Sequence, residues 1–211
     1  MANWITHTRI ADILINKGLD VDIKGFCIGN IAPDCNIENE NWTAYIPPKE
    51  VTHFMSEKEN KTTSDYEGFY NQFIKDKVFK SKEEYSFLLG YYSHLITDAQ
   101  YQKFIRDEIR VQNSFTRIKT NEEMRKKIEE YPEGFSTLKK VFGKWNVFAD
   151  IIELENEYIK SHTDCSYNKI LRNTKGFPDY LDFFPENAIP SLMIFSIPSS
   201  LSSRSYRFSS I

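Results

Sequence analysis

The sequence predicts an all-α fold, because apolar residues recur at helical spacing, helix-capping signals recur, and strand-like alternation is scarce. The chain has 211 residues, of which 40% are hydrophobic and 15% aromatic, so it is long enough to bury one sizeable core. With only 8 glycines and 8 prolines, long helical stretches run uninterrupted. We therefore expect one multi-helix domain over residues 1–188.

The first two expected helices lead to an acidic residue on a loop. Apolar side chains of residues 10–14 share one helical face, and Gly18 lies where a left-handed residue would end this helix. A second helix is expected over residues 23–31. Pro33 disfavours helical backbone at the residue before it, so Asp34 should lie on a loop at a helix exit.

Residues 36–48 are polar and end in two consecutive prolines, which predicts an extended surface connection. It delivers His53 to the body of the protein between apolar neighbours.

Three later helix starts carry a hydroxyl residue followed three positions on by Glu, the pattern of a capping box. These pairs are Ser64 with Glu67, Ser81 with Glu84, and Thr120 with Glu123. The helices expected from here on cover residues 65–78, 82–112, 121–131 and 147–159.

The composition changes near the C-terminal end. No acidic residue follows Glu186, two prolines break any helix, and serines dominate. We expect residues 189–211 to form a Ser-rich, poorly ordered tail.

Charge and cysteine content exclude several classes of protein. The formal net charge of -3 provides no positive field for a nucleic-acid backbone, so no nucleic-acid partner is expected. The three cysteines, Cys27, Cys35 and Cys165, lack the CxxC spacing of a zinc knot and are odd in number. No secretory signal opens the sequence, and its longest apolar stretch is too short for a transmembrane span. A cytoplasmic location is expected.

The apolar stretch of residues 85–98 predicts a helix buried on all sides, and it contains two ionisable residues. His94 and Asp98 are four positions apart, so they project from the same helix face and can share a metal ion. Gly90, one turn earlier, leaves that face open. A buried carboxylate needs a cation or a fully bonded partner. On this segment alone, a metal site and a purely structural His-Asp hydrogen bond are about equally supported.

The other histidines favour the metal. Three of the four histidines, His7, His53 and His94, stand in apolar surroundings, whereas His162 lies in a polar stretch and is expected on the surface. Imidazole nitrogens with carboxylate oxygens form the usual zinc site that lacks cysteine. One ion could take Asp34, His53, His94 and Asp98, and a second could use His7 and share Asp98.

Four motifs, in order along the chain, resemble the bacterial zinc-dependent phospholipase C family over roughly the first 110 residues. They are Trp4-Ile5-Thr6-His7, Gly29-Asn30-Ile31-Ala32-Pro33-Asp34, Val51-Thr52-His53-Phe54 and Gly90-Tyr91-Tyr92-Ser93-His94-Leu95-Ile96-Thr97-Asp98. The resemblance implies an all-α fold like that of P1-type nucleases and hydrolysis of phosphate esters. It also implies metal-ligand roles for His7, Asp34, His53, His94 and Asp98.

The family pattern adds a further pair of histidines and a Glu for another zinc. Beyond Asp98 this chain has only His162, followed four positions later by Ser166. We therefore expect one or two zinc ions, or another divalent metal, and no three-metal cluster.

The first functional hypothesis is a phospholipase C-like hydrolase of phosphate esters, acting on a small phosphate ester or a phospholipid. Metal-activated water would attack phosphorus, and Asp34 would orient or deprotonate that water. The alternative is a protein that kept the metal for structure or interaction after losing catalysis. A third class, the HD phosphohydrolases, is disfavoured because the sequence has no His-Asp dipeptide. The substrate-binding residues and the oligomeric state are not indicated.

Overall fold

In the computed structural model, the protein is built around one long central helix, α5. The structure describes residues 2–38, 44–55, 64–142, 149–185 and 189. Its elements, in chain order, are α1 (Trp4–Asn16), α2 (Ile23–Gly29), the short 3-10 helix η1 (Ala32–Asp34), β1 (Ile37–Glu38), β2 (Tyr45–Ile46), α3 (Lys49–Thr52), α4 (Tyr66–Phe73), α5 (Lys82–Ile105), α6 (Glu108–Lys119), α7 (Glu122–Ile128), α8 (Phe135–Phe142), α10 (Ala149–Ser161), α11 (Ser166–Lys169) and the 3-10 helix η2 (Leu171–Asn173).

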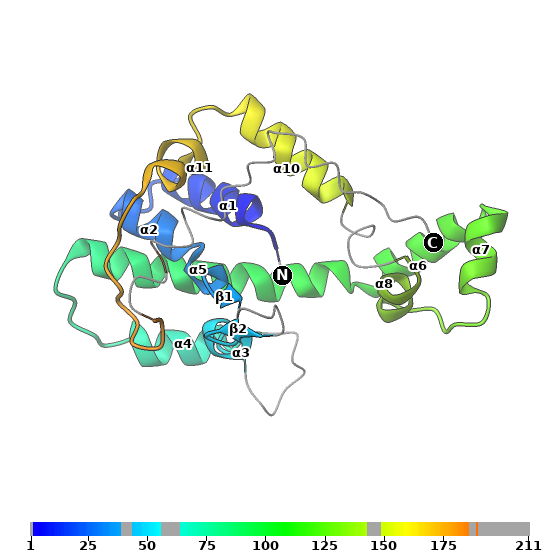
Figure 1. Ribbon diagram of the computed structural model, residues 1–211, viewed down its shortest axis with the longest axis horizontal. Coiled ribbons are helices and arrows are strands. Elements are labelled where there is room, and N and C mark those ends of the chain that lie inside the picture. The colour runs from blue at the N-terminus through cyan, green and yellow to red at the C-terminus, as the bar shows by residue number, and fades with distance from the viewer. Residues whose placement is uncertain (1, 39–43, 56–63, 143–148, 186–188, 190–211) are drawn as a thin grey trace.

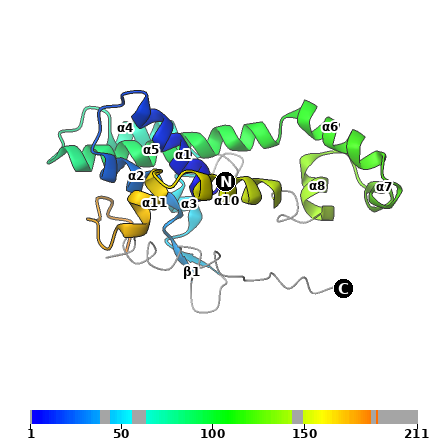
Figure 2. The same cartoon turned by 90° about the horizontal axis from the view of Figure 1, so that it is seen from above.

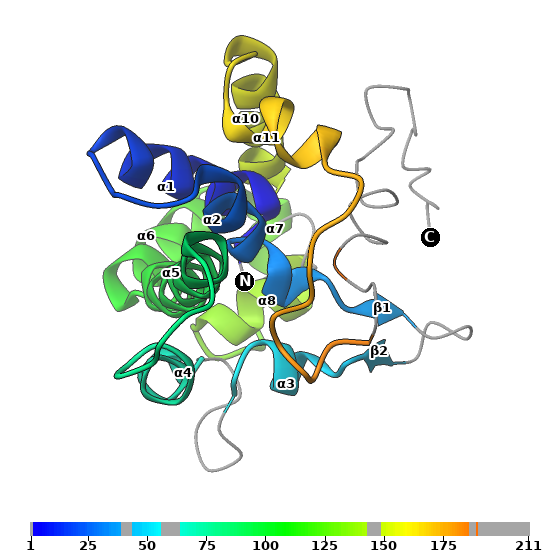
Figure 3. The ribbon, with the colours of Figure 1, turned by 90° about the vertical axis from the view of Figure 1, so that its left-hand side faces the viewer.

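The all-α prediction is confirmed. Seen along its axis, α5 is flanked by α1 and α2 on one side and by α4 on another (Figure 3). Its face along Leu89, Tyr92 and Ile96 is only half-buried, so the expectation of a helix buried on all sides is wrong. Aromatic side chains fill the main core around it, including Phe26, Phe69, Phe87 and Tyr91, each at most 1% exposed. The described strands are the antiparallel pair β1 and β2, in which Ile37 lies opposite Ile46. This pair falls in the connection that was predicted to be extended.

Helices α6, α7 and α8 extend beyond the far end of α5, away from α1, α2 and α4 (Figures 1 and 2). They pack around a small hydrophobic cluster of their own, formed by Val111, Phe115, Ile128 and Leu138. Neither α8 nor α11 was predicted from the sequence. No helix in the described part of the chain combines the length and hydrophobicity needed to span a bilayer.

The helix expected over residues 82–112 is wrong in its extent, because the helix is interrupted between α5 and α6. Asp107 begins a new helix there, and its carboxylate accepts a hydrogen bond from the backbone N–H of Arg110 at 3.0 Å. Such a local side-chain bond satisfies a free backbone donor and favours a new helix start.

Of the three expected helix caps, the structure keeps Ser81, which accepts from Glu84 N at 3.1 Å. The other two caps lie one residue later than predicted. Asp65 accepts from Gly68 N at 2.8 Å, and Asn121 accepts from Met124 N at 3.0 Å. Carboxylate and amide oxygens cap a helix at least as well as a hydroxyl does, which explains the shift.

The three cysteines are free and buried. Ile189 is buried in the main core. The rest of the predicted tail, residues 190–211, lies outside the described residues, so its disorder stays a prediction.

Candidate metal centre

The five residues singled out from the sequence come from four elements and meet beside α5. His7 lies on α1, Asp34 ends η1, His53 follows α3, and His94 and Asp98 project from α5. Asp98 is at the centre of the group. Its carboxylate oxygens lie 3.5 Å from His7 Nε2, 3.6 Å from His53 Nε2 and 3.7 Å from His94 Nε2. Asp34 joins through His53, whose Nε2 is 3.3 Å from Asp34 Oδ1.

The turn after α3 fixes the position of His53. Met55 N bonds to Glu50 O at 2.9 Å and Phe54 N bonds to Val51 O at 3.1 Å, which is the hydrogen-bond pattern of a Schellman motif. This motif requires a left-handed residue, and Phe54 adopts a φ of 52°. The Phe54 ring is held against the rings of Phe69 and Phe73, with centroids 5.7 and 6.0 Å away. The packed ring therefore anchors the turn that presents the imidazole.

Two glycines set how closely α2 approaches α5. A Cβ atom on Gly90 would lie 2.2 Å from the backbone oxygen of Phe26, and one on Gly29 would lie 2.0 Å from that of Phe87. The space beside Gly90 therefore holds the α2 backbone, and the expectation that Gly90 leaves the face open is wrong. The close crossing instead brings the carbonyl of Asn30 to the ring of His94.

Hydrogen bonds at Nδ1 determine which nitrogen faces the cluster. His94 Nδ1 lies 2.8 Å from the backbone oxygen of Asn30, which can only accept, so Nδ1 carries the hydrogen. The hydroxyl of Thr52 lies 3.5 Å from Lys49 O, to which it donates, and 3.0 Å from His53 Nδ1. With its hydrogen directed at Lys49, this hydroxyl can accept from His53 Nδ1. His94 thus presents its Nε2 lone pair to the carboxylates, and His53 does so in the tautomer that carries its hydrogen on Nδ1.

Several buried polar atoms of the cluster have no hydrogen-bond partner. Within the described residues, no hydrogen-bond partner exists for either ring nitrogen of His7, for Nε2 of His53 or His94, or for Oδ2 of Asp98. Asp98 Oδ1 has one partner, the backbone N–H of Ala2 at 2.7 Å. Buried polar atoms without a partner are unfavourable, and a divalent cation bound by their lone pairs relieves this. The nitrogen and oxygen donor set fits zinc.

Two overlapping groups of donor atoms could hold an ion. One consists of His7, His94 and Asp98, and the other of Asp34, His53 and His94, with the atoms of each group within 4.8 Å of one another. One imidazole nitrogen serves one ion, whereas the two oxygens of a carboxylate can serve two. Either group could hold one ion, and a second ion would have to share Asp98, because His94 can serve only one of them.

Contacts with the imidazoles keep the two acids ionised, and burial keeps the imidazole of His94 neutral. Burial and the adjacent ring of His7 lower the pKa of His94 to about 3. Burial opposes ionisation of Asp34, but the contact with His53 and the nearby imidazoles lower its pKa to about 2. The pKa of Asp98 is also lowered, because the imidazoles of His7 and His94 outweigh its burial. These are the protonation states that ligate a metal.

Exposure distinguishes Asp34 from the other four residues. The side chains of the three histidines are 0% exposed and that of Asp98 is 3% exposed, whereas that of Asp34 is 15% exposed. Any solvent or substrate that reaches the cluster in this conformation meets Asp34 first. His162, predicted on the surface, is exposed there and stacks on Tyr158 with ring centroids 4.2 Å apart.

Sequence reasoning missed the residues that support the cluster. Asn30 and Thr52 act on the Nδ1 atoms, and Glu155 of α10 is buried against the start of α1. The carboxylate of Glu155 accepts from Asn3 Nδ2 at 2.8 Å, Thr6 N at 3.2 Å and Thr6 Oγ1 at 2.7 Å. Asn30 and Thr52 could have been found from the sequence, because each lies inside one of the four motifs that resemble the family. Glu155 could not, because about 150 residues of sequence separate it from α1.

Comparison with known proteins gives one family. The family model described as zinc dependent phospholipase C matches residues 5–101, a range that includes all five residues of the cluster. No curated protein matches the chain. No solved structure matches it either.

Proposed function

We propose that this protein is a zinc-dependent hydrolase of phosphate esters, because residues 5–101 match the family model of zinc-dependent phospholipase C. The ligands in this proposal are His7, Asp34, His53, His94 and Asp98. The observation that carries it is the convergence of buried polar atoms without hydrogen-bond partners around Asp98, because three buried imidazoles beside two carboxylates suit a bound cation. The substrate is a small phosphate ester or a phospholipid.

When bound, zinc would acidify a water molecule and neutralise charge on the phosphoryl oxygens. The chain's own contribution is orientation. Asn30 and Thr52 hold the rings of His94 and His53 in the tautomer that ligates, and Asp98 receives its remaining hydrogen bond from Ala2. Such outer partners fix ring orientation and raise the basicity of the ligand.

We assign Asp34 to orienting the attacking water. It is the most exposed side chain of the cluster, which supports a place where water and substrate meet the site. A carboxylate with a pKa of about 2 is a weak base, so removal of a proton by Asp34 alone is disfavoured. Asp34 therefore orients the attacking water and does not deprotonate it.

One observation favours the second candidate, a metal-stabilised protein without catalysis. Four of the five side chains are at most 3% exposed, as in closed structural zinc sites. A catalytic site must keep one position open for exchange. The exposed edge of Asp34 is the feature that supports the hydrolase over this alternative.

The cytoplasmic location stays a prediction from the sequence.

Hydrolysis of a chromogenic phosphodiester, bis(p-nitrophenyl) phosphate, by the zinc-loaded protein tests the proposal. We expect turnover that EDTA abolishes and zinc restores, with Asp34→Asn reduced about 100-fold. His162→Ala is the matched control, because it removes the one histidine outside the cluster and should leave turnover unchanged. Zinc binding without turnover would favour the structural candidate, and full turnover by Asp34→Asn would remove the orienting role.

A further inference from the structure

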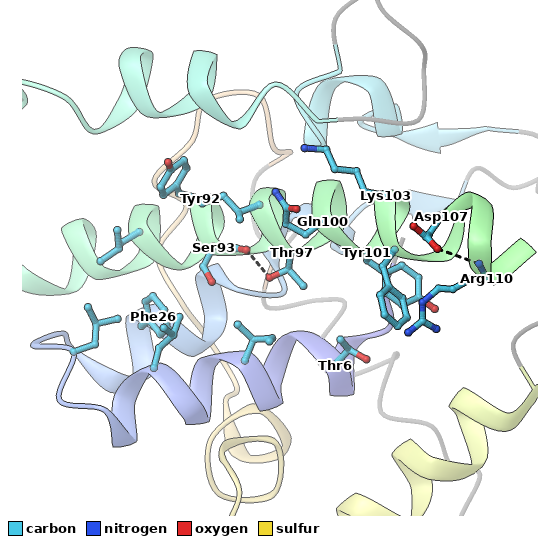
Figure 4. Close-up of a pocket in the computed structure, with 16 residues that line it drawn as sticks. Thr6, Phe26, Tyr92, Ser93, Thr97, Gln100, Tyr101, Lys103, Asp107 and Arg110 are labelled. Atoms are coloured by element: carbon cyan, nitrogen blue, oxygen red, sulfur yellow. Dashed lines mark hydrogen bonds between the residues drawn. The ribbon is translucent and has the colours of Figure 1, made fainter.

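A second candidate site lies on the reverse side of α5. A groove with a cavity volume of 1170 Å³ runs between α1 and α5 and reaches the start of α6 (Figure 4). Along α5, Ile96 and Gln100 line the groove, and each comes two positions after His94 or Asp98. Two residues turn a helix by about 200°, so these side chains point away from the metal cluster. The groove is therefore a separate site.

The groove is mainly apolar along its length. Its lining includes Ile10 and Leu14 of α1, Leu89 and Ile96 of α5, and the rings of Phe26 and Phe104. From Leu89 to Phe104 the groove follows α5 for about 22 Å, given the rise of an α-helix. Ligand sites are typically apolar clefts with a few placed polar groups. A long, open apolar groove matches an extended hydrocarbon chain.

The charged side chains of the groove come from its end near α6, where the positive charges outnumber the negative. Arg110 lines the end of the groove far from Phe26, and Lys103 lines it from the opposite side of α5 (Figure 4). Both are exposed, and no acidic side chain among the described residues forms an ion pair with either. The guanidinium of Arg110 lies over the ring of Phe104, 3.5 Å from its centroid. One acidic residue, Asp107, also lines this end, and its Oδ1 accepts from Arg110 N.

We propose that this groove binds a single-chain anionic amphiphile of the fatty-acid class. The hydrocarbon chain lies along α1 and α5, the carboxylate lies at Arg110, and Lys103 adds positive charge at the rim of the groove. An arginine whose flat face rests on an aromatic ring keeps its N–H edge available, and that edge pairs with a carboxylate in a two-pronged geometry. This proposal does not depend on the hydrolase, because no ligand of the metal cluster lines the groove.

Binding of cis-parinaric acid, a fluorescent fatty acid, to the full-length protein tests the proposal. We expect saturable fluorescence enhancement that EDTA leaves unchanged and that palmitate reverses, whereas hexadecyltrimethylammonium does not compete. Lys103→Glu with Arg110→Glu should weaken binding about tenfold or more. Lys77→Glu with Arg125→Glu is the matched control, because it makes the same charge change at exposed residues outside the groove and should alter affinity by less than about twofold.

A second pair of variants tests the location. Ser93→Trp places an indole in the middle of the groove, and Gln100→Trp does so from an exposed position that tolerates a large side chain. Either variant, if its circular dichroism spectrum and melting temperature match those of the wild type, should lose saturable binding. Absence of binding to the wild type, equal loss in the charge control, or unchanged binding in both folded Trp variants would overturn the proposal.

Discussion

The imidazole rings of His7 and His94 stack face to face, with centroids 3.7 Å apart and planes within 7° of parallel. The stack joins α1 to α5, and both Nε2 atoms lie within 3.7 Å of an oxygen of Asp98. A proton on His94 would be buried beside a second imidazole. Burial and this neighbour account for the lowered pKa of His94.

The metal-free protein should therefore lose stability in mild acid. The pKa of His94 is about 3 when folded and about 6.5 when unfolded, so between these values only the unfolded chain binds the proton. Stability falls as pH decreases wherever the unfolded state binds more protons, by about 2 kcal/mol between pH 7 and pH 5 for this group. Asp34, whose pKa is lowered to about 2, adds a loss below about pH 4.

Urea denaturation of EDTA-treated protein at pH 7 and pH 5 measures this effect. His94→Asn should have a smaller difference in unfolding free energy between the two pH values, and His162→Ala should keep the wild-type difference. A wild-type protein that is equally stable or more stable at pH 5 would contradict the account.

The close approach of α2 to α5 at Gly90 predicts that a larger residue there destabilises the protein. Gly90→Ala should destabilise the protein by about 2 kcal/mol or more, because the new methyl group would overlap the Phe26 carbonyl and α2 would have to move. Gly134→Ala is the control, since a Cβ there meets only Ser136 Oγ at 3.9 Å. Thermal or urea unfolding compares the two variants. Equal stability of both would mean that the close crossing of α2 and α5 is absent.

The sequence was sufficient to predict the fold class and to single out the five residues of the cluster. The i to i+4 spacing of His94 and Asp98, and the apolar settings of His7 and His53, depend on local pattern, which a single sequence contains. Their convergence could not be derived from that pattern alone, because it depends on the crossing of α2 and α5. The resemblance to a family supplied that missing link.

The features that the sequence did not predict depend on competition between neighbours or on distant contacts. The long helix breaks at Asp107 because a side-chain cap there outcompetes continuation of α5. The role of Gly90 depends on a partner helix more than 60 residues away in sequence. The contact of Glu155 with α1 has no local signal, because the residues it bonds are at the other end of the chain.

Glu155 provides a prediction that connects stability to the metal centre. Its carboxylate caps the first turn of α1, where Asn3 makes no side-chain cap of its own. Glu155→Ala should destabilise the protein by about 2 kcal/mol, because the donors of Asn3 and Thr6 lose their shared, buried acceptor. Since α1 carries His7, zinc affinity should fall as well.

Glu153→Ala is the control for this prediction, because it removes an exposed carboxylate from the same helix. Urea unfolding and a competitive zinc-binding assay measure both effects. A Glu155→Ala protein with the stability and zinc affinity of the control would show that α10 does not position α1.

The metal content of the purified protein tests the central claim most directly. Elemental analysis of the wild type, measured beside His94→Ala and His162→Ala, should find one or two zinc ions per chain in the wild type and in His162→Ala. His94→Ala should lose most of this zinc, because Nε2 of His94 belongs to both groups of donor atoms. Absence of zinc and of any other divalent metal from the wild type, even after incubation with excess zinc, would contradict the metal centre.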